Sequence, residues 1–206
     1  MKIIDKEPKH HAPALLYACL LRENQELIDR GLGDSLEAEE LADQMDRPWY
    51  AMTDAEQKRM RGLSADLYAL REGGLKRIGM TAEQAAGWRL AVEEALEKIE
   101  GGDVDSLLEF LREPIPAEIP SHVIWFLESM AWDRLGDLET ALVFMKAVEK
   151  EDPGYALQVS QLLRRLERVD EAVAHEAKFV GRALDPLTAV HGANQPWFDL
   201  VHALKG

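Results

Sequence analysis

The stretch between Trp125 and Pro153, WFLESMAWDRLGDLETALVFMKAVEKEDP, constrains the fold most, because its spacing is that of two short helices joined by a tight break. Trp125, Ser129 and Trp132 lie four and three residues apart, so they fall on one face of a helix. The small Ser129 leaves room on that face for a neighbouring helix. Gly136 follows and ends this first helix.

A second helix is predicted after the break. Ala141, Met145 and Val148 lie four and three residues apart, so they form an apolar stripe that faces back towards the first helix. Pro153 ends the pattern, because proline cannot continue a helix. The stretch is therefore one complete helix–turn–helix unit, and such a unit indicates a binding scaffold without identifying what is bound.

This unit resembles a tetratricopeptide repeat. The family pattern is a Trp, a small residue four positions later, an aromatic residue three beyond that, then Ala, a large apolar residue four later, and Pro. The residue before the small one is usually apolar in the family, whereas it is Glu128 here. The positions that match are Trp125, Ser129, Trp132, Gly136, Ala141, Met145 and Pro153.

The unit recurs in a weaker form on both sides, so the resemblance covers one good repeat and two degenerate ones across residues 88–184. Antiparallel helix pairs with short loops would give similar apolar spacing without belonging to the family. An upstream shift of 34 residues aligns Gly102-Asp103-Val104, Leu107 and Leu111 with Gly136-Asp137-Leu138, Ala141 and Met145. A downstream shift of 31 residues aligns Ala156, Ser160, Leu163, Val169 and Ala172 with Trp125, Ser129, Trp132, Leu138 and Ala141.

The resemblance implies a concave groove, lined by the first helix of each repeat, that binds a protein or peptide partner. Its apolar positions and its arginines would suit a peptide with hydrophobic anchors and acidic groups, because guanidinium pairs with carboxylate. Carried over residue by residue, the groove positions are Val123, Phe126, Met130, Asp133, Arg134, Leu157, Gln161, Arg164 and Arg165.

Two observations limit this expectation. Family members that bind chaperone tails hold a C-terminal carboxylate with a lysine and asparagines, and the matching positions here are Phe126 and Met130, so we expect no clamp of that kind. The arginines could equally form an ordinary solvated helix face that pairs with Asp133, Glu167 or Asp170.

The N-terminal third matches no family. Helices are predicted over residues 13–30 and 36–46, and RPWY at 47–50 is expected to end the second helix with Trp49 and Tyr50 against the core. The capping box Thr53-Asp54-Ala55-Glu56 opens a third helix that ends at Gly73-Gly74. Residues 75–80 are predicted to be a linker, which divides the chain into an N-terminal helical region, 1–75, and a repeat array, 81–206, unless the two form one continuous domain.

The second part begins with another capping box, Thr81-Ala82-Glu83-Gln84. Its predicted helices run to Gly101-Gly102, over 103–112, through the central repeat at 121–150, and over 154–167 and 170–183; three prolines make 114–120 an extended connector. Pro196 starts a short helix with Trp197 and Phe198 that would cap the array. No run predicts a strand, so the expected class is all-α: antiparallel helix pairs stacked as a short tetratricopeptide-like solenoid.

Composition bounds the partners and the compartment. The 206 residues carry a net charge of −14, and an acidic chain is repelled by phosphate backbones and anionic lipid, so nucleic acid and membrane surfaces are poor partners. A single cysteine, Cys19, excludes an internal disulfide. The apolar run APALLYACLL follows Asp5 and Glu7 and lacks a small-residue cleavage site, so we expect a helix, and a cytoplasmic protein.

We expect no catalysis, metal or cofactor. The six histidines, including the pair His10-His11, show no metal-ligand spacing, and phosphate-binding loops and nucleophile elbows are absent. Self-association is the alternative to a scaffold, as a homo-oligomeric structural or regulatory protein. The segments around Trp197-Phe198 and Trp49-Tyr50 would then pair two copies, unless they pack internally. An enzyme with an unrecognised site is the remaining alternative.

Overall fold

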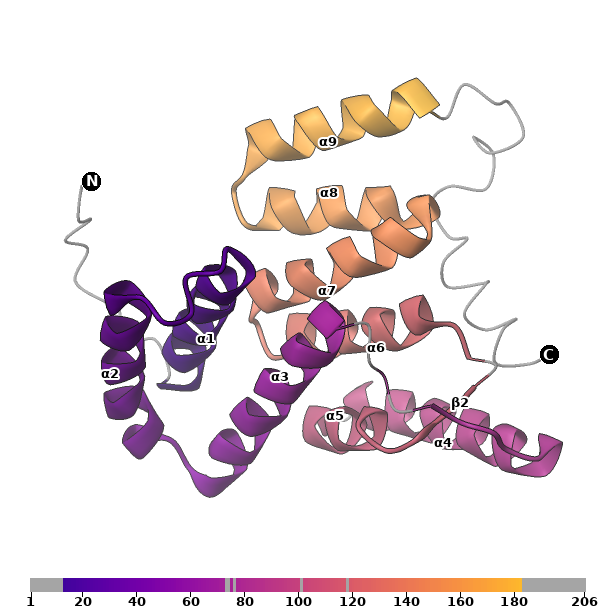
Figure 1. Cartoon of the computed structure of the whole chain (residues 1–206). Helices are drawn as coiled ribbons and strands as arrows, with labels where there is room; N and C mark the ends of the chain where they lie inside the picture. Colours follow the sequence, from indigo (N-terminus) through magenta and orange to yellow (C-terminus); the bar gives the residue numbers. More distant parts are fainter. Residues whose placement is uncertain (1–12, 73–74, 76, 101, 118, 183–206) are drawn as a thin grey trace. The chain divides into compact units, whose positions relative to one another are not determined.

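The computed structural model describes residues 13–72, 75, 77–100, 102–117 and 119–182, in which nine α-helices account for most of the secondary structure. The expected all-α class is confirmed at this level (Figure 1). The chain divides into two compact units, Met1–Ala69 and Leu70–Gly206, which are described separately below. The histidine pair His10-His11 and the predicted capping helix after Pro196 lie outside the described residues.

The first unit contains α1 (Pro13–Asp29), α2 (Leu36–Ala51) and most of α3 (Asp54–Glu72). α1 and α2 pack together through a small apolar core. Ser35 begins α2, since its hydroxyl accepts a hydrogen bond from the backbone N–H of Ala38. The members of the core are Leu20, Leu27, Ala38 and Leu41, with Met45 packed against them.

The predicted end of the second helix at residues 47–50 is wrong, because α2 continues through Pro48 to Ala51. Pro48 is buried in the last turns, and its neighbour Trp49 packs 5.2 Å from the ring of Tyr17. The guanidinium of Arg61 also packs on Trp49, 5.2 Å from the centroid of its ring. This packing supports a helical turn that proline alone disfavours. Tyr50 was expected against the core but is 79% exposed.

Between residues 77 and 182, the described part of the second unit has six helices: α4 (Ala82–Glu100), α5 (Val104–Leu111), α6 (Ser121–Arg134), α7 (Leu138–Glu151), α8 (Ala156–Arg165) and α9 (Val169–Arg182). Each of these helices packs against the next one along the chain, and α4–α5, α6–α7 and α8–α9 are antiparallel pairs joined by tight turns (Figure 1). A 3-10 turn at Pro153–Tyr155 joins α7 to α8.

Two-residue strands, which the sequence did not predict, join the linker before α4 to the connector before α6. β1 (Arg77–Ile78) and β2 (Ile115–Pro116) pair in parallel. The side chain of Arg77 donates hydrogen bonds to the Ile119 carbonyl and to Ser121 Oγ, the latter at 2.7 Å. Strands of this length carry no detectable alternation, so only the tertiary contact defines them.

The turns within the three helix pairs repeat one backbone conformation. Gly102, Gly136 and Glu167 have φ angles of 93°, 81° and 61°, and they are separated by the same intervals of 34 and 31 residues that align the sequence repeats. Asp103 and Asp137 follow the two glycines. Each accepts hydrogen bonds from the backbone N–H and the hydroxyl of the residue three positions later.

The core of the central pair explains its Trp–Ser–Trp spacing. Trp125 stacks on Phe144 with ring centroids 5.7 Å apart, as Trp88 lies 5.6 Å from Phe110 in the preceding pair. Ser129 is 1% exposed, and its hydroxyl donates a 2.8 Å hydrogen bond to the carbonyl of Ala141 on α7. The small side chain therefore allows the close approach that was expected.

Replacing the turn residues tests their left-handed conformation. A Cβ at Gly136 would meet no atom within 4 Å, so Gly136→Ala should destabilise through backbone strain alone, by about 1 kcal/mol. Glu167→Gly should stabilise by about 0.5–1 kcal/mol, because it relieves the same strain. Urea denaturation measures both. Gly87→Ala, within α4, is the control and should stabilise slightly; equal signs for Gly136→Ala and Gly87→Ala would contradict the explanation.

The capping boxes predict a difference in pH dependence. The pKa of Glu56 is lowered from its ordinary value of 4.5, first because the Thr53 backbone N–H bonds the carboxylate and second because the Thr53 hydroxyl does so. This contribution to stability is present above the unfolded pKa and is lost as pH falls through the folded one.

Thr53→Ala removes the hydroxyl bond to the Glu56 carboxylate and leaves the backbone N–H bond, so its cost should be moderately larger near neutral pH than at about pH 3. Thr81→Ala removes the hydroxyl that accepts from the Gln84 backbone N–H, in a box whose side-chain acceptor is the uncharged Gln84, so its cost should not change over this range. Thermal denaturation as a function of pH measures both variants. A parallel loss in the two variants would contradict the assignment.

Candidate functional site

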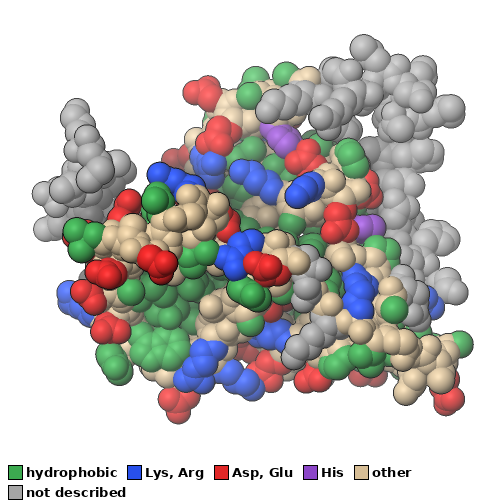
Figure 2. Space-filling model, viewed as in Figure 1, with side chains coloured by type: hydrophobic (Ala, Val, Ile, Leu, Met, Phe, Trp, Pro, Cys, Tyr) green, Lys and Arg blue, Asp and Glu red, His purple; other side chains and the backbone are tan. Residues whose placement is uncertain are grey.

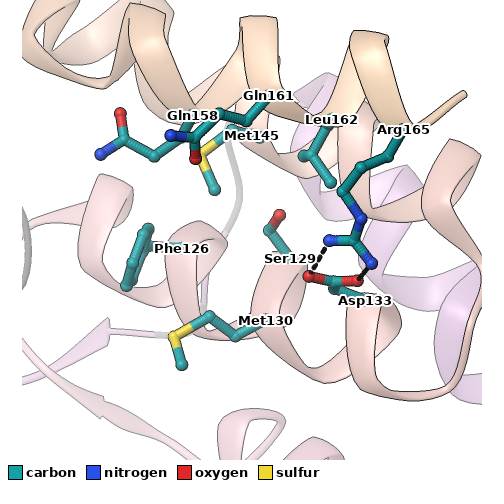
Figure 3. Close-up of a pocket in the computed structure, with 9 residues that line it drawn as sticks. All are labelled: Phe126, Ser129, Met130, Asp133, Met145, Gln158, Gln161, Leu162 and Arg165. Atoms are coloured by element: carbon teal, nitrogen blue, oxygen red, sulfur yellow. Dashed lines mark hydrogen bonds and ion pairs between the residues drawn. The ribbon is translucent and has the colours of Figure 1, made fainter. Parts of the chain in front are cut away.

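In the second unit, a pocket of about 220 Å³ lies between α6, α7 and α8 (Figure 3). Because α6 and α8 are the first helices of successive pairs, the pocket lies between neighbouring helix pairs. Nine residues line it: Phe126, Ser129, Met130, Asp133, Met145, Gln158, Gln161, Leu162 and Arg165.

Apolar side chains from all three helices make up much of the lining. Phe126 from α6, Met145 from α7 and Leu162 from α8 are at most 8% exposed, and Met130 is half-buried. The ring of Phe126 also lies 5.2 Å from that of Tyr155 in the turn before α8, so packing holds it in place. The pocket therefore has a preformed apolar wall.

An ion pair spans the pocket from α6 to α8. Arg165 donates two hydrogen bonds to Asp133, of 2.5 and 2.6 Å, and these bonds raise the pKa of the Arg165 guanidinium (Figure 3). The charges of the two side chains thus neutralise each other within the site. Since about half of the Arg165 side chain is exposed, the pair contributes little to stability.

The uncharged polar groups differ in how they are satisfied. Ser129 already donates its hydroxyl to the Ala141 carbonyl. Gln158 has a buried side-chain oxygen with no hydrogen-bond partner. Gln161, one turn further along α8, is exposed. An unpaired buried acceptor is costly, so the Gln158 side chain gains from any rearrangement that gives this oxygen a donor.

The structure brings together five of the nine predicted groove residues. Val123 is instead 3% exposed, Leu157 is half-buried outside the pocket lining, and Arg134 is exposed. Arg164 also lies outside the lining and donates two hydrogen bonds to Glu176 on α9, at 3.0 and 2.8 Å. The five residues that do line the pocket are Phe126, Met130, Asp133, Gln161 and Arg165.

Two of the three predicted arginines therefore pair within the protein. The pairing of Arg165 with Asp133 is one of the alternatives that the sequence left open, whereas Arg164 uses Glu176, which was not among the expected partners. Arg134 has no ion pair within the part of the chain that the structure describes. Of the three arginines that suggested an acidic partner, the one without an ion pair among the described residues is therefore outside the pocket lining.

Four lining residues were missed as site residues, although two of them had been assigned to helix packing. Ser129 and Met145 were interpreted as contacts between α6 and α7, and they also border the pocket. Gln158 and Leu162 follow from helical spacing once Gln161 and Arg165 are placed, since residues three and four apart share a face. Helical spacing could therefore have predicted that residues 158, 161, 162 and 165 share one face of α8.

Glu128, the departure from the family pattern, is 1% exposed in α6 and accepts a 3.3 Å hydrogen bond from the indole N–H of Trp132. Glu128 and Trp132, which lie one turn apart on α6, are therefore hydrogen-bonded to each other. This bond helps to explain how a glutamate is accommodated at a position that the family fills with an apolar residue.

No group of three histidine, cysteine or carboxylate side chains is placed to hold a metal ion in the described ranges. His122 Nδ1 lies 3.9 Å from a carboxylate oxygen of Glu151, and His175 Nε2 lies 3.0 Å from one of Glu149. On the face seen in Figure 2, acidic and basic side chains are interspersed. None of the helices in the described residues is both long and apolar enough to cross a membrane.

Comparison with protein-family models, with curated proteins and with solved structures gave no match. The site is therefore interpreted from its own residues and geometry.

A double-mutant cycle tests whether the ion pair across the pocket has a structural role. Asp133→Ala, Arg165→Ala and the double variant should give a coupling free energy below about 1 kcal/mol in urea denaturation, because both side chains are partly exposed. Trp132→Ala is the comparison and should cost about 3–5 kcal/mol, since Trp132 is 1% exposed. A coupling above about 2 kcal/mol would instead show that the pair supports helix packing.

Proposed function

We propose that this protein is a non-catalytic protein-interaction scaffold, built from tetratricopeptide-like helix pairs, that binds a partner peptide or protein in the groove between α6 and α8. The observation that carries the proposal is the preformed apolar pocket between the first helices of successive pairs, where Phe126, Met145 and Leu162 are buried by packing. Since these side chains are already ordered, little ordering cost would fall on the scaffold when a partner binds.

The repeated turns support a repeat architecture. The left-handed residues at Gly102, Gly136 and Glu167 coincide with the sequence repeats, and Asp103 and Asp137 make the same helix cap. The helix pairs are joined by similar turns, and each helix packs on the next one along the chain. This arrangement is expected of a short solenoid. The same geometry favours a groove on the side of the first helices.

The size and chemistry of the pocket favour a protein side chain over a small metabolite. Its volume, about 220 Å³, is below the range of about 300–1,000 Å³ that is typical of small-molecule sites. Ser129, the one hydroxyl in the lining, is bonded to a backbone carbonyl and lies beside no basic imidazole or amine in that lining. This composition supports binding rather than nucleophilic catalysis. A cytoplasmic location is part of the proposal and rests on the sequence.

The role of the pocket can be tested with one variant that introduces a negative charge into its apolar wall and one matched control. Met130→Glu places a carboxylate in the half-buried wall of the pocket. Val173→Glu makes a comparable apolar-to-acidic change at a site on α9 that is 51% exposed and outside the pocket. Capture from native lysate with quantitative mass spectrometry compares both variants with the unaltered chain, and circular dichroism checks that both fold.

We expect at least one partner to be retained by Val173→Glu and reduced about tenfold or more by Met130→Glu, since burying an unpaired charge opposes binding. A partner retained equally by both folded variants would bind elsewhere on the protein and would contradict the groove. If neither the unaltered chain nor the control captures a partner, self-association becomes the better interpretation, with the exposed Tyr50 as its first candidate contact.

A further inference from the structure

We infer that the pocket accepts one uncharged, apolar side chain of a peptide whose backbone amide is held by the carboxamides of Gln158 and Gln161. This inference rests on the proposed function and specifies the chemistry of the partner. It replaces the acidic peptide suggested by the arginines with a neutral apolar anchor.

The hydrogen-bonding groups on α8 point to a peptide backbone. Gln158 and Gln161 are three residues apart, so their carboxamides lie along one wall of the pocket, across from Phe126 and Met130 (Figure 3). A primary amide carries both a donor and an acceptor, which match the carbonyl and the N–H of a peptide unit. The oxygen of Gln158 is buried and has no partner. When a peptide binds, the Gln158 carboxamide would turn toward the pocket so that this oxygen accepts the backbone N–H.

The charges in the site argue for an uncharged anchor. Asp133 and Arg165 are the two charged side chains among the lining residues, and each already holds the other through two hydrogen bonds. A charged side chain that entered the pocket would have to break this pair or remain unpaired against Phe126 and Met145. An apolar side chain such as Leu, Met or Phe meets neither obstacle.

The volume limits the occupant to one side chain of this kind. The pocket is smaller than a typical small-molecule site, and its walls come from three packed helices. Met130 and Met145 line it, and the flexible thioether side chain adapts to apolar groups of different shape. We therefore expect tolerance among Leu, Met and Phe, and rejection of Asp, Glu, Lys and Arg at the anchor position.

The probe for the test is a random twelve-residue phage-displayed peptide library, selected on the immobilised full chain. The selected peptide is then synthesised and its affinity measured by fluorescence anisotropy. Gln158→Met removes the carboxamide but keeps the length of the side chain. Gln44→Met is the matched control, because Gln44 lies on α2 in the other unit and donates a hydrogen bond to the Glu40 carbonyl of its own helix. The peptide is also prepared with its anchor-position N–H methylated.

The expected result is a consensus with one Leu, Met or Phe and no required acidic residue. Gln158→Met should weaken binding of the peptide about tenfold, as the loss of one hydrogen bond implies, and Gln44→Met should leave the affinity unchanged. Methylation of the backbone N–H should weaken binding to the unaltered chain but should have little further effect on Gln158→Met, since both changes remove the same bond.

Several outcomes would overturn the inference while leaving the scaffold proposal intact. One is a consensus with a required acidic residue whose binding depends on Arg134. Another is a selected peptide whose binding is abolished by Met130→Glu but is unchanged by Gln158→Met and by N-methylation. Displacement of the selected peptide by a synthetic peptide of residues 191–206 would assign the pocket to a segment of this chain. Failure to select any peptide, together with no partner lost from Met130→Glu, would contradict both the inference and the proposed function.

Discussion

The architecture of the second unit depends on the close approach of α6 and α7. Ser129 permits that approach, because its side chain is small and its hydroxyl bonds the Ala141 carbonyl of the opposite helix. Trp125 then reaches Phe144, and Trp132 is buried to 1% exposure. With the two helices held at this distance, α7 presents a continuous surface to α8, and the next helix pair is positioned by it. Bulk at position 129 would separate the helices and disturb every later contact.

The pocket is a consequence of this packing. Two first helices, α6 and α8, stand on either side of the edge of α7, and the space between them is filled only in part by Phe126, Met145 and Leu162. The ion pair between Asp133 and Arg165 spans the same gap, so it neutralises the charge that the sequence appeared to offer an acidic partner. The chemistry of the site is therefore set by which side chains already satisfy one another.

Sequence reasoning named five of the residues that line the pocket but not the rest of its lining. Phe126 and Met130 could be placed because α6 lies in the stretch that best matches the tetratricopeptide pattern, and that resemblance implies which helix face lines the expected groove. On α8 the shorter interval of 31 residues left the register loose, and Leu157 and Arg164 were chosen where Gln158 and Leu162 line the pocket. A shift of one residue rotates a helical side chain by about 100°, which is enough to exchange a pocket residue for a neighbour.

The sequence by itself determined the helices, most of their ends, and the spacing of the turns, because these depend on local chemistry such as the cap of Thr53 and the left-handed freedom of Gly136. Only the tertiary structure decided that α2 continues through Pro48, that β1 pairs with β2, and that Arg165 bonds Asp133. Each of these features depends on residues brought together from separate elements or on packing against them. Local spacing carries no information about which distant group will be the partner, and that is why the chemistry of the pocket became visible only in the folded chain.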